Sequence, residues 1–124
     1  MHCGDTFLMA PLLGLDPHLW IIVTEADANG DVVIANVTTL QESADQTVIL
    51  RKGNHPFIHH DSVVRFGDAR IVKMNSIKAQ LTAATIQPRE ACSKELLAEI
   101  QAGVLASDHT PRKVITFCRK AWGK

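Results

Sequence analysis

Short apolar runs separated by turn residues occupy the first 72 positions of the chain. They are rich in β-branched and aromatic residues, which predicts strands rather than helices. Asn29-Gly30 predicts a type I′ turn between the second and third strands, because both residues accept a positive φ. Turn residues at 11–17, Gly14 among them, connect the first two strands. The expected strands span residues 6–10, 18–24, 32–37, 47–50 and 62–72, the last bent at Gly67.

The period of the apolar positions changes after residue 72. Residues 77–86 fit a strand or a weak helix, and Thr82 and Thr85 favour the strand, which Pro88 would end. Apolar residues then recur at helical spacing over 93–106, with Ser93 as the expected N-cap. Thr110-Pro111 predicts a second helix start, N-cap followed by an N1 proline, and an amphipathic helix over 111–122 with a basic polar side.

These elements predict one domain over residues 1–124. The strands are too short to form stable sheets alone, so residues 1–87 are expected to close into a small antiparallel β-barrel or a strongly bent sheet. One or two C-terminal α-helices, 93–106 and 111–122, follow it. The fold class predicted from the sequence is therefore mainly β.

Composition excludes several other classes of protein. Hydrophobic residues make up 46% of the chain and charged residues 21%, as in globular rather than disordered proteins. No apolar run approaches the roughly 18 to 20 residues that span a bilayer. The first residues lack the pattern of a secretion signal, and the three cysteines form no CxxC pair. We therefore expect a cytoplasmic protein with reduced cysteines and no membrane partner.

The net charge of zero hides an asymmetry between the two halves of the sequence. Residues 1–50 contain seven acidic residues and no Lys or Arg, whereas all 13 basic residues follow position 50. If the halves form different faces, the basic one would attract a polyanion or an acidic protein partner. If the chain interleaves them, the field cancels, and the sequence leaves both outcomes open.

The loop after residue 50 carries His55, His59 and His60. Imidazoles at this spacing can share a metal on a helix, but Pro56 interrupts any helical register. Hydrogen-bonded or solvated histidines are therefore the preferred interpretation, with no metal and no cofactor expected. One of them can still act as a proton carrier near neutral pH.

The common signatures of hydrolases, kinases and dinucleotide-binding enzymes, among them GxSxG, the P-loop, GxGxxG and HExxH, do not occur in the chain. No sequence setting indicates a stabilised cysteine thiolate either. Two further candidates stay open. The basic side of the C-terminal helix is usually a solvated face but can contact phosphate, and Arg65 in one strand can act together with Thr38 at the end of another.

These two residues lie within segments that occur in a familiar order and spacing: GDTFLM (4–9), IIVTEAD (21–27), VIANVTTL (33–40) and VVRFGDARIVKM (63–74). Together with SKELLAEIQAGVL (93–105), they resemble the PemK/MazF family of toxins from toxin-antitoxin modules. The resemblance covers residues 4–105. It implies an SH3-like barrel that forms a homodimer, cuts single-stranded RNA without a metal, and is inhibited by an antitoxin peptide.

The resemblance also implies roles for particular residues. Arg65 would clamp the phosphate, because a guanidinium stays charged and grips phosphate oxygens in a bidentate way, and Thr38 would donate a hydrogen bond to the same phosphate. A separate hypothesis, based on closeness in sequence to Arg65 and not on the resemblance, is that His59 or His60 supplies the general base. Further candidate substrate-binding residues are Thr39, Asp68, Arg70 and His18.

The chain also departs from the family pattern. His18-Leu19 stands where family members carry Arg-Pro, Asp68 lies three residues past Arg65 rather than two, and the loop before His18 is short. The function we expect is a toxin-like, metal-independent endoribonuclease. The alternative is a non-catalytic SH3-like barrel that binds a protein or nucleic acid through the same surface.

Overall fold

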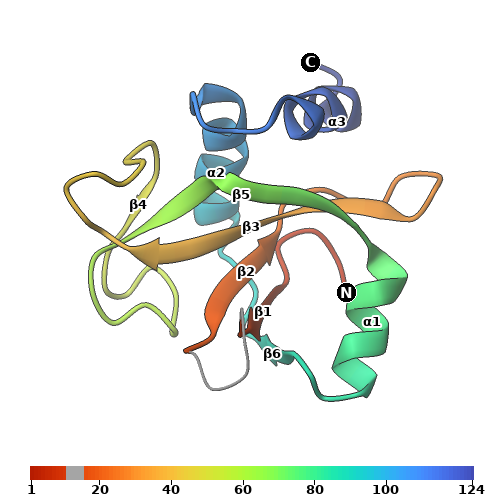
Figure 1. The fold of residues 1–124 in the computed structure, drawn as a ribbon, viewed down its shortest axis with the longest axis horizontal. Helices are drawn as coiled ribbons and strands as arrows, with labels where there is room; N and C mark the ends of the chain where they lie inside the picture. The colour runs from red at the N-terminus through yellow and green to blue at the C-terminus, as the bar shows by residue number, and fades with distance from the viewer. Residues whose placement is uncertain (11–15) are drawn as a thin grey trace.

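The computed structural model describes residues 1–10 and 16–124, and the predicted connection around Gly14 lies outside these ranges. A bent antiparallel sheet carries three helices (Figure 1), which confirms a mainly β fold with two C-terminal helices. The strands are β1 (Thr6–Met9), β2 (His18–Ile22), β3 (Asp31–Thr39), β4 (Ile49–Leu50), β5 (Ser62–Lys73) and β6 (Gln87–Arg89). The helices are α1 (Met74–Thr82), α2 (Lys94–Ala106) and α3 (Arg112–Trp122).

The strands follow the order β4-β5-β3-β2-β1-β6, and every neighbouring pair is antiparallel. The two longest strands, β3 and β5, form the middle of the sheet, which curls into a half-barrel with β4 and β6 at its edges (Figure 1). Of the two predicted outcomes, a closed barrel and a strongly bent sheet, the structure adopts the second.

Both faces of the sheet are buried over most of its area. Val33, Ala35 and Val37 of β3 point to the face that α2 and α3 cover, and they belong to the larger core. Val32 and Ile34 point to the opposite face, where a smaller core forms with α1; we call this the α1 face. Two buried faces explain why β3 reads as a nearly continuous apolar run instead of alternating with polar residues.

A bulge interrupts the pairing of β5 with β3. Asn36 pairs with Arg65 and Ile34 pairs with Arg70, so four residues of β5 lie opposite the single residue Ala35. The expected bend at Gly67 falls within this bulge, and β5 continues through it as one strand. The bulge changes which side chains of β5 share a face.

Residues 74–82 form a helix, so the preference for a strand between 77 and 86 was wrong. Met74 and Ile77 lie on one side of α1 and are buried in the smaller core, and this packing overrides the weak local preference of Thr82. The hydroxyl of Thr82 donates to the carbonyl of Lys78 within the helix, at 3.1 Å. Pro88 lies inside β6, an edge strand, where its missing N–H group is tolerated.

The predicted cap of α2 is confirmed, whereas that of α3 is wrong. The Ser93 hydroxyl accepts a hydrogen bond from the backbone N–H of Leu96 at 3.1 Å. At α3 the N-cap is Pro111, and the buried hydroxyl of Thr110 has no hydrogen-bond partner in the described part of the chain. The helix therefore begins one residue later than the sequence predicts, without a side-chain cap.

The turn between β2 and β3 is wider than the type I′ turn that Asn29-Gly30 predicts. Gly30 has a φ of 78°, but Asn29 keeps a negative φ. The carboxylate of Asp27 accepts hydrogen bonds from the backbone N–H groups of Asn29 and Asp31, both at 2.9 Å. This Asx-type arrangement supplies the local alternative to the tight turn.

No helix within residues 1–10 and 16–124 is both long enough and apolar enough to cross a lipid bilayer.

Gly103 marks the closest approach of α2 to the sheet. A Cβ atom at this position would lie 2.5 Å from Cζ of Phe66 and 2.6 Å from a methyl group of Val48, both of them buried. We expect Gly103→Ala to lower the free energy of unfolding by about 1–2 kcal/mol, since overpacking costs more than the gain in helix propensity of about 0.5–1 kcal/mol. Urea denaturation measures the change.

Gly67→Ala is the matched control, because its nearest neighbours lie at 3.8 Å, an ordinary contact distance. Equal stability of the two variants would contradict the close approach at Gly103.

Candidate functional site

The pairing of β2, β3 and β5 places the candidate residues in rows across the α1 face. Trp20 pairs with Asn36, which pairs with Arg65, and Thr38 pairs with Val63 one step further along β3. Side chains two residues apart in a strand share a face, so Thr38 and Arg65 are diagonal neighbours on the same side of the sheet.

The bulge in β5 adds a second arginine to this face. Arg65 and Arg70 are five residues apart, a spacing that places side chains on opposite faces of a regular strand. Here they lie opposite Asn36 and Ile34, which share the α1 face. Two guanidinium groups therefore converge beyond the end of the smaller core.

Arg70 is held flat against Trp20. Its guanidinium carbon lies 4.7 Å from the centre of the indole ring, a cation–π geometry, and its Nε donates to the carbonyl of Asp68 at 3.3 Å. Trp20 itself is buried, whereas Arg70 is exposed. The stack leaves the outer surface of the guanidinium facing the solvent.

Arg65 is less constrained than Arg70. Its Nε lies 3.5 Å from Oδ2 of Asp68, and the amide of Asn36 donates to the same oxygen at 3.2 Å. The Arg65 side chain is 62% exposed, so this ion pair is weak. The guanidinium can therefore exchange the carboxylate for another anion.

His18 presents one nitrogen to the same region. Its Nδ1 lies 3.2 Å from the carbonyl oxygen of Val37, and a carbonyl only accepts, so Nδ1 carries the proton. In the neutral ring this contact leaves Nε2 as the basic nitrogen. The second strand thus positions a group able to accept a proton.

Three clefts meet at Thr38. The central cleft, about 470 Å³, is lined by His18, Trp20, Asn36, Thr38, Arg65 and Arg70, with Asp68 and Met9 at its margin. The Asp45 cleft, about 490 Å³, contains Thr38, Thr39, Arg65, Asp68 and His109 as well as Asp45. The histidine cleft, about 630 Å³, contains His18, Thr38, Thr39, His59 and His60.

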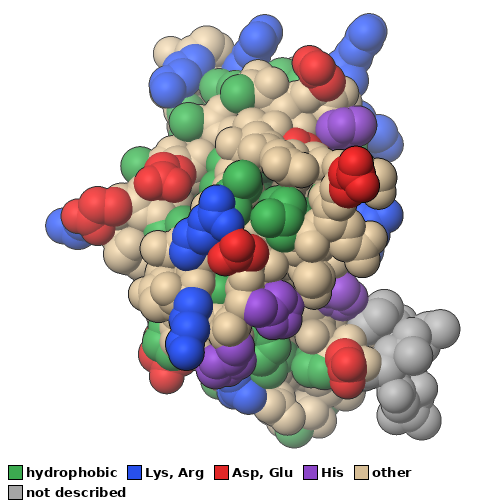
Figure 2. Space-filling view, turned by 90° about the vertical axis from the view of Figure 1, so that its left-hand side faces the viewer, with side chains coloured by type: hydrophobic (Ala, Val, Ile, Leu, Met, Phe, Trp, Pro, Cys, Tyr) green, Lys and Arg blue, Asp and Glu red, His purple; other side chains and the backbone are tan. Residues whose placement is uncertain are grey.

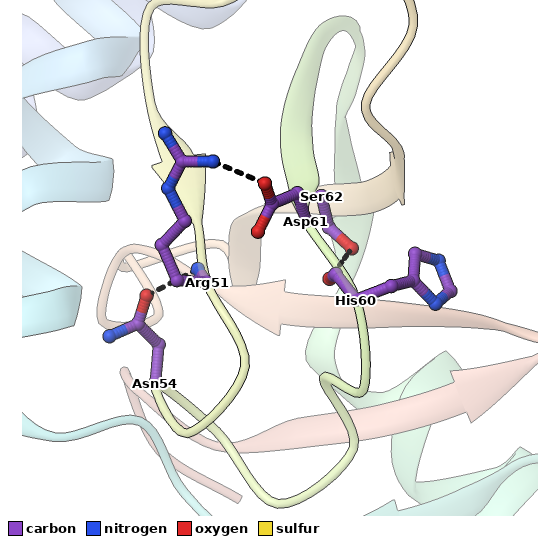
Figure 3. A network of polar contacts seen from close by, with 5 residues as sticks. All are labelled: Arg51, Asn54, His60, Asp61 and Ser62. Atoms are coloured by element: carbon purple, nitrogen blue, oxygen red, sulfur yellow. Dashed lines mark hydrogen bonds and ion pairs between the residues drawn. The ribbon is translucent and has the colours of Figure 1, made fainter.

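The structure thus brings most of the candidate residues together but separates two of them from the arginines. His59 and His60 line the histidine cleft, of which Arg65 and Arg70 are not part. Nε2 of His60 lies 3.1 Å from the hydroxyl of Thr39, and its ring points away from the ion pair of Arg51 and Asp61 (Figure 3). Among the described residues, His18, Thr38 and Thr39 are the ones that this cleft shares with the other two.

His55 is a structural residue. It is buried, its Nδ1 accepts from the backbone N–H of Phe57 at 3.0 Å, and its Nε2 faces the carbonyl of Glu90 and the hydroxyl of Thr6. These contacts tie the loop after β4 to the other end of the sheet. Among the described residues, no three His, Cys, Asp or Glu side chains are grouped so as to hold a metal ion.

The cysteines offer no stabilised thiolate. Burial raises the pKa of Cys92 to about 11 and that of Cys118 to about 12. Burial and the negative charge of Glu25 also raise the pKa of Cys3. Because the thiolate is the reactive form, these shifts oppose nucleophilic catalysis by any of the three.

The two halves of the sequence interleave in the fold. β3, from the acidic half, pairs along its length with β5, from the basic half, and Lys73 forms an ion pair with Asp31 at 2.8 Å. Figure 2 shows charges of both signs and histidines mixed over the face that it presents. The charges on this face therefore do not add up to an electrostatic potential of one sign. Attraction of an anion depends instead on local groups such as Arg65 and Arg70.

Asp45 is a residue of the site that the sequence did not indicate. Its carboxylate accepts from the hydroxyl of Ser107 at 2.6 Å and from the hydroxyl and N–H of Thr47 at 2.6 and 3.0 Å. Burial acts to raise the pKa of this carboxyl, but the hydrogen bonds from Ser107 and Thr47 outweigh it, and the pKa is lowered. Asp45 thereby fastens the loop after β3 to the end of α2.

Comparisons of the sequence with protein-family models and with curated proteins give no match. The half-barrel with C-terminal helices is compatible with an SH3-like, PemK-like fold.

The lowered pKa of Asp45 predicts a stability change at acid pH. A lowered folded-state pKa contributes stability above the unfolded value of about 3.9, and this contribution is lost as the pH falls through the folded-state value. We expect Asp45→Asn to cost on the order of 0.5–1 kcal/mol of unfolding free energy at pH 7. The difference from wild type should shrink below about pH 4.

Urea denaturation between pH 2.5 and 7 measures this difference. Glu42→Gln is the control, since within the described structure the exposed Glu42 side chain makes no hydrogen bond or ion pair. A difference between wild type and Asp45→Asn that stays constant over this range would contradict the assignment.

Proposed function

We propose that the protein is a toxin-like, metal-independent endoribonuclease that acts on single-stranded RNA, in the manner of the PemK/MazF family. The observation that carries this proposal is the meeting of His18, Thr38 and Arg65 in the central cleft. A proton acceptor, a hydrogen-bond donor and a cation are the groups that cleavage of RNA through its own 2′-hydroxyl requires.

Each step of this reaction has a candidate group. Nε2 of His18 takes the proton of the ribose 2′-hydroxyl, whose oxygen attacks the adjacent phosphorus atom. Arg65 and Thr38 hold the non-bridging oxygens, on which negative charge develops in the pentacoordinate transition state. The bond from phosphorus to the 5′-oxygen then breaks, which yields a 2′,3′-cyclic phosphate and a 5′-hydroxyl.

The departing 5′-oxygen requires a proton. A strand of RNA that passes over Thr38 enters the histidine cleft, where His59 and His60 are located. In this proposal one of them donates that proton, while Thr39 and Asp68 border the path of the strand. On the sequence alone, His59 or His60 is the hypothetical general base. In this proposal His18 takes that role, because among the described histidines it is the one that shares the central cleft with Arg65.

Partners follow from the same surface. Within the proposal, an acidic antitoxin peptide inhibits the enzyme by occupying Arg65 and Arg70, and the active form is a homodimer. The rival function, a non-catalytic module, uses the same cleft to bind RNA or an acidic protein without cutting the RNA.

Replacing Arg65 tests the clamp. We expect Arg65→Ala to lower kcat/KM for a fluorescent single-stranded oligoribonucleotide by about 100-fold or more, with Arg65→Lys in between, since a lysine loses the bidentate grip. Cleavage is measured with EDTA present. Arg112→Ala on α3, an exposed cation outside the three clefts, is the control and should keep full activity. Tight RNA binding by wild type with no cleavage would favour the binding module.

Replacing His18 tests the base. A general base is inactive when protonated, so activity of wild type should fall on the acidic side of the pH profile. We expect His18→Gln to lower kcat/KM by about 100-fold and to abolish that acidic limb. His2→Gln, at an exposed histidine outside the three clefts, should leave the limb unchanged. An acidic limb that persists in His18→Gln and vanishes in His59→Gln or His60→Gln would return the base to the histidine cleft.

A further inference from the structure

The central cleft contains residues in addition to those that would hold the phosphate. Beside His18, Thr38 and Arg65, it includes the stacked pair of Arg70 and Trp20. Its volume of about 470 Å³ lies within the range of about 300–1,000 Å³ that is usual for small-ligand sites. It therefore has room for a group attached to the phosphate.

Arg70 presents a fixed, flat surface to this space. The indole of Trp20 supports one side of the guanidinium, and the bond from Nε to the carbonyl of Asp68 limits its rotation. That bond also occupies the edge formed by Nε, one of the edges with which a guanidinium grips a phosphate. Arg65, which has no such support, is the better anion ligand, and Arg70 is better suited to stacking.

The side chain of Asn36 lies between the two arginines with an unused acceptor. Its Nδ2 donates to the carboxylate of Asp68 at 3.2 Å, and a carboxylate only accepts, so the orientation of the amide is fixed. Its Oδ1 is buried and has no hydrogen-bond partner among the described residues, while Asn36 as a whole is 5% exposed. An unsatisfied buried acceptor is costly, and an N–H group of a bound ligand would relieve that cost.

We propose that this part of the central cleft is a nucleobase-binding subsite. A base next to the phosphate held by Arg65 stacks on the outer surface of the Arg70 guanidinium, and a ring or amino N–H of that base turns toward Asn36. Bases stack on the planes of arginine guanidinium groups as they do on aromatic rings. Such a site therefore binds a nucleotide that carries a base more tightly than an abasic one. The subsite rests on the proposed function for the identity of its ligand, RNA. It requires that the protein binds RNA, but not that it cleaves it.

A binding experiment with a non-cleavable probe tests the subsite. The probe is a labelled 2′-O-methyl tetranucleotide, which lacks the attacking hydroxyl, and each of four variants carries an abasic sugar at one position. Fluorescence anisotropy measures Kd at low salt. We expect wild type to bind one of the abasic variants about five- to tenfold more weakly than the intact probe, and the other three almost equally well.

Variants of Arg70 then separate stacking from charge. Arg70→Lys keeps the positive charge but not the flat surface, and it should reduce the penalty of the sensitive abasic position to less than about twofold. Arg65→Lys should weaken binding of all probes alike and preserve that penalty. Arg119→Lys on α3 is the control and should change neither quantity.

The outcomes distinguish the two proposals. A base-dependent penalty that Arg70→Lys removes, in a protein that does not cleave RNA, would support the subsite and overturn the ribonuclease. Cleavage with equal binding of all five probes would overturn the subsite alone. A penalty that Arg70→Lys leaves intact would also overturn it, and failure to bind any probe at low salt would overturn both.

Discussion

The bulge of β5 opposite Ala35 is the constraint on which the rest of the site depends. Without it, Arg65 and Arg70 would project to opposite faces of the sheet, and one of them would have to enter the core beneath α2 and α3. A buried, unpaired guanidinium would cost several kcal/mol, so the regular strand is the less stable arrangement for this sequence. The two charges instead share the open part of the α1 face. Asp68, carried by the bulge itself, lies between them and contacts both, through its carboxylate and its carbonyl.

The unequal cover of the two faces explains why the clefts lie where they do. α2 and α3 bury one face of the half-barrel, whereas α1 lies against the other face (Figure 1), where its Met74 and Ile77 join the smaller core. Beyond Trp20 the residues of the described α1 face change from apolar to Asn36, Thr38 and the two arginines. The smaller core thus ends at Trp20, on which Arg70 is stacked. The same two side chains line the central cleft.

Local sequence patterns predicted those features that depend on neighbouring residues in the chain. The strands of the half-barrel follow from their apolar runs, and the start of α2 follows from the hydroxyl of Ser93. Thr38 and Arg65 share a face because β3 pairs with β5, a pairing that the sequence patterns did not predict. The position of Arg70 depends on the size of the bulge, of which the sequence indicated only a bend at Gly67. Contacts between distant parts of the chain decided the remaining features: the burial of Met74 and Ile77 turned an ambiguous segment into α1, the carbonyl of Glu90 drew His55 into the interior, and the carbonyl of Val37 oriented His18.

The Arg65–Asp68 pair contributes less free energy than a hydrogen bond from Arg65 to a phosphate, so the cleft can contain an internal ion pair and still accept an anion. The exposed pair of Arg65 and Asp68 is worth about 0–1 kcal/mol, whereas a charge-assisted hydrogen bond to a phosphate is worth about 1.5–3 kcal/mol and is often doubled by bidentate geometry. A phosphodiester can therefore displace the carboxylate of Asp68 from Arg65. The displaced carboxylate keeps the amide of Asn36 as a donor at 3.2 Å, so it is not left without a partner. Asp68 thus pairs with Arg65 in the free protein and still leaves Arg65 available to a phosphodiester.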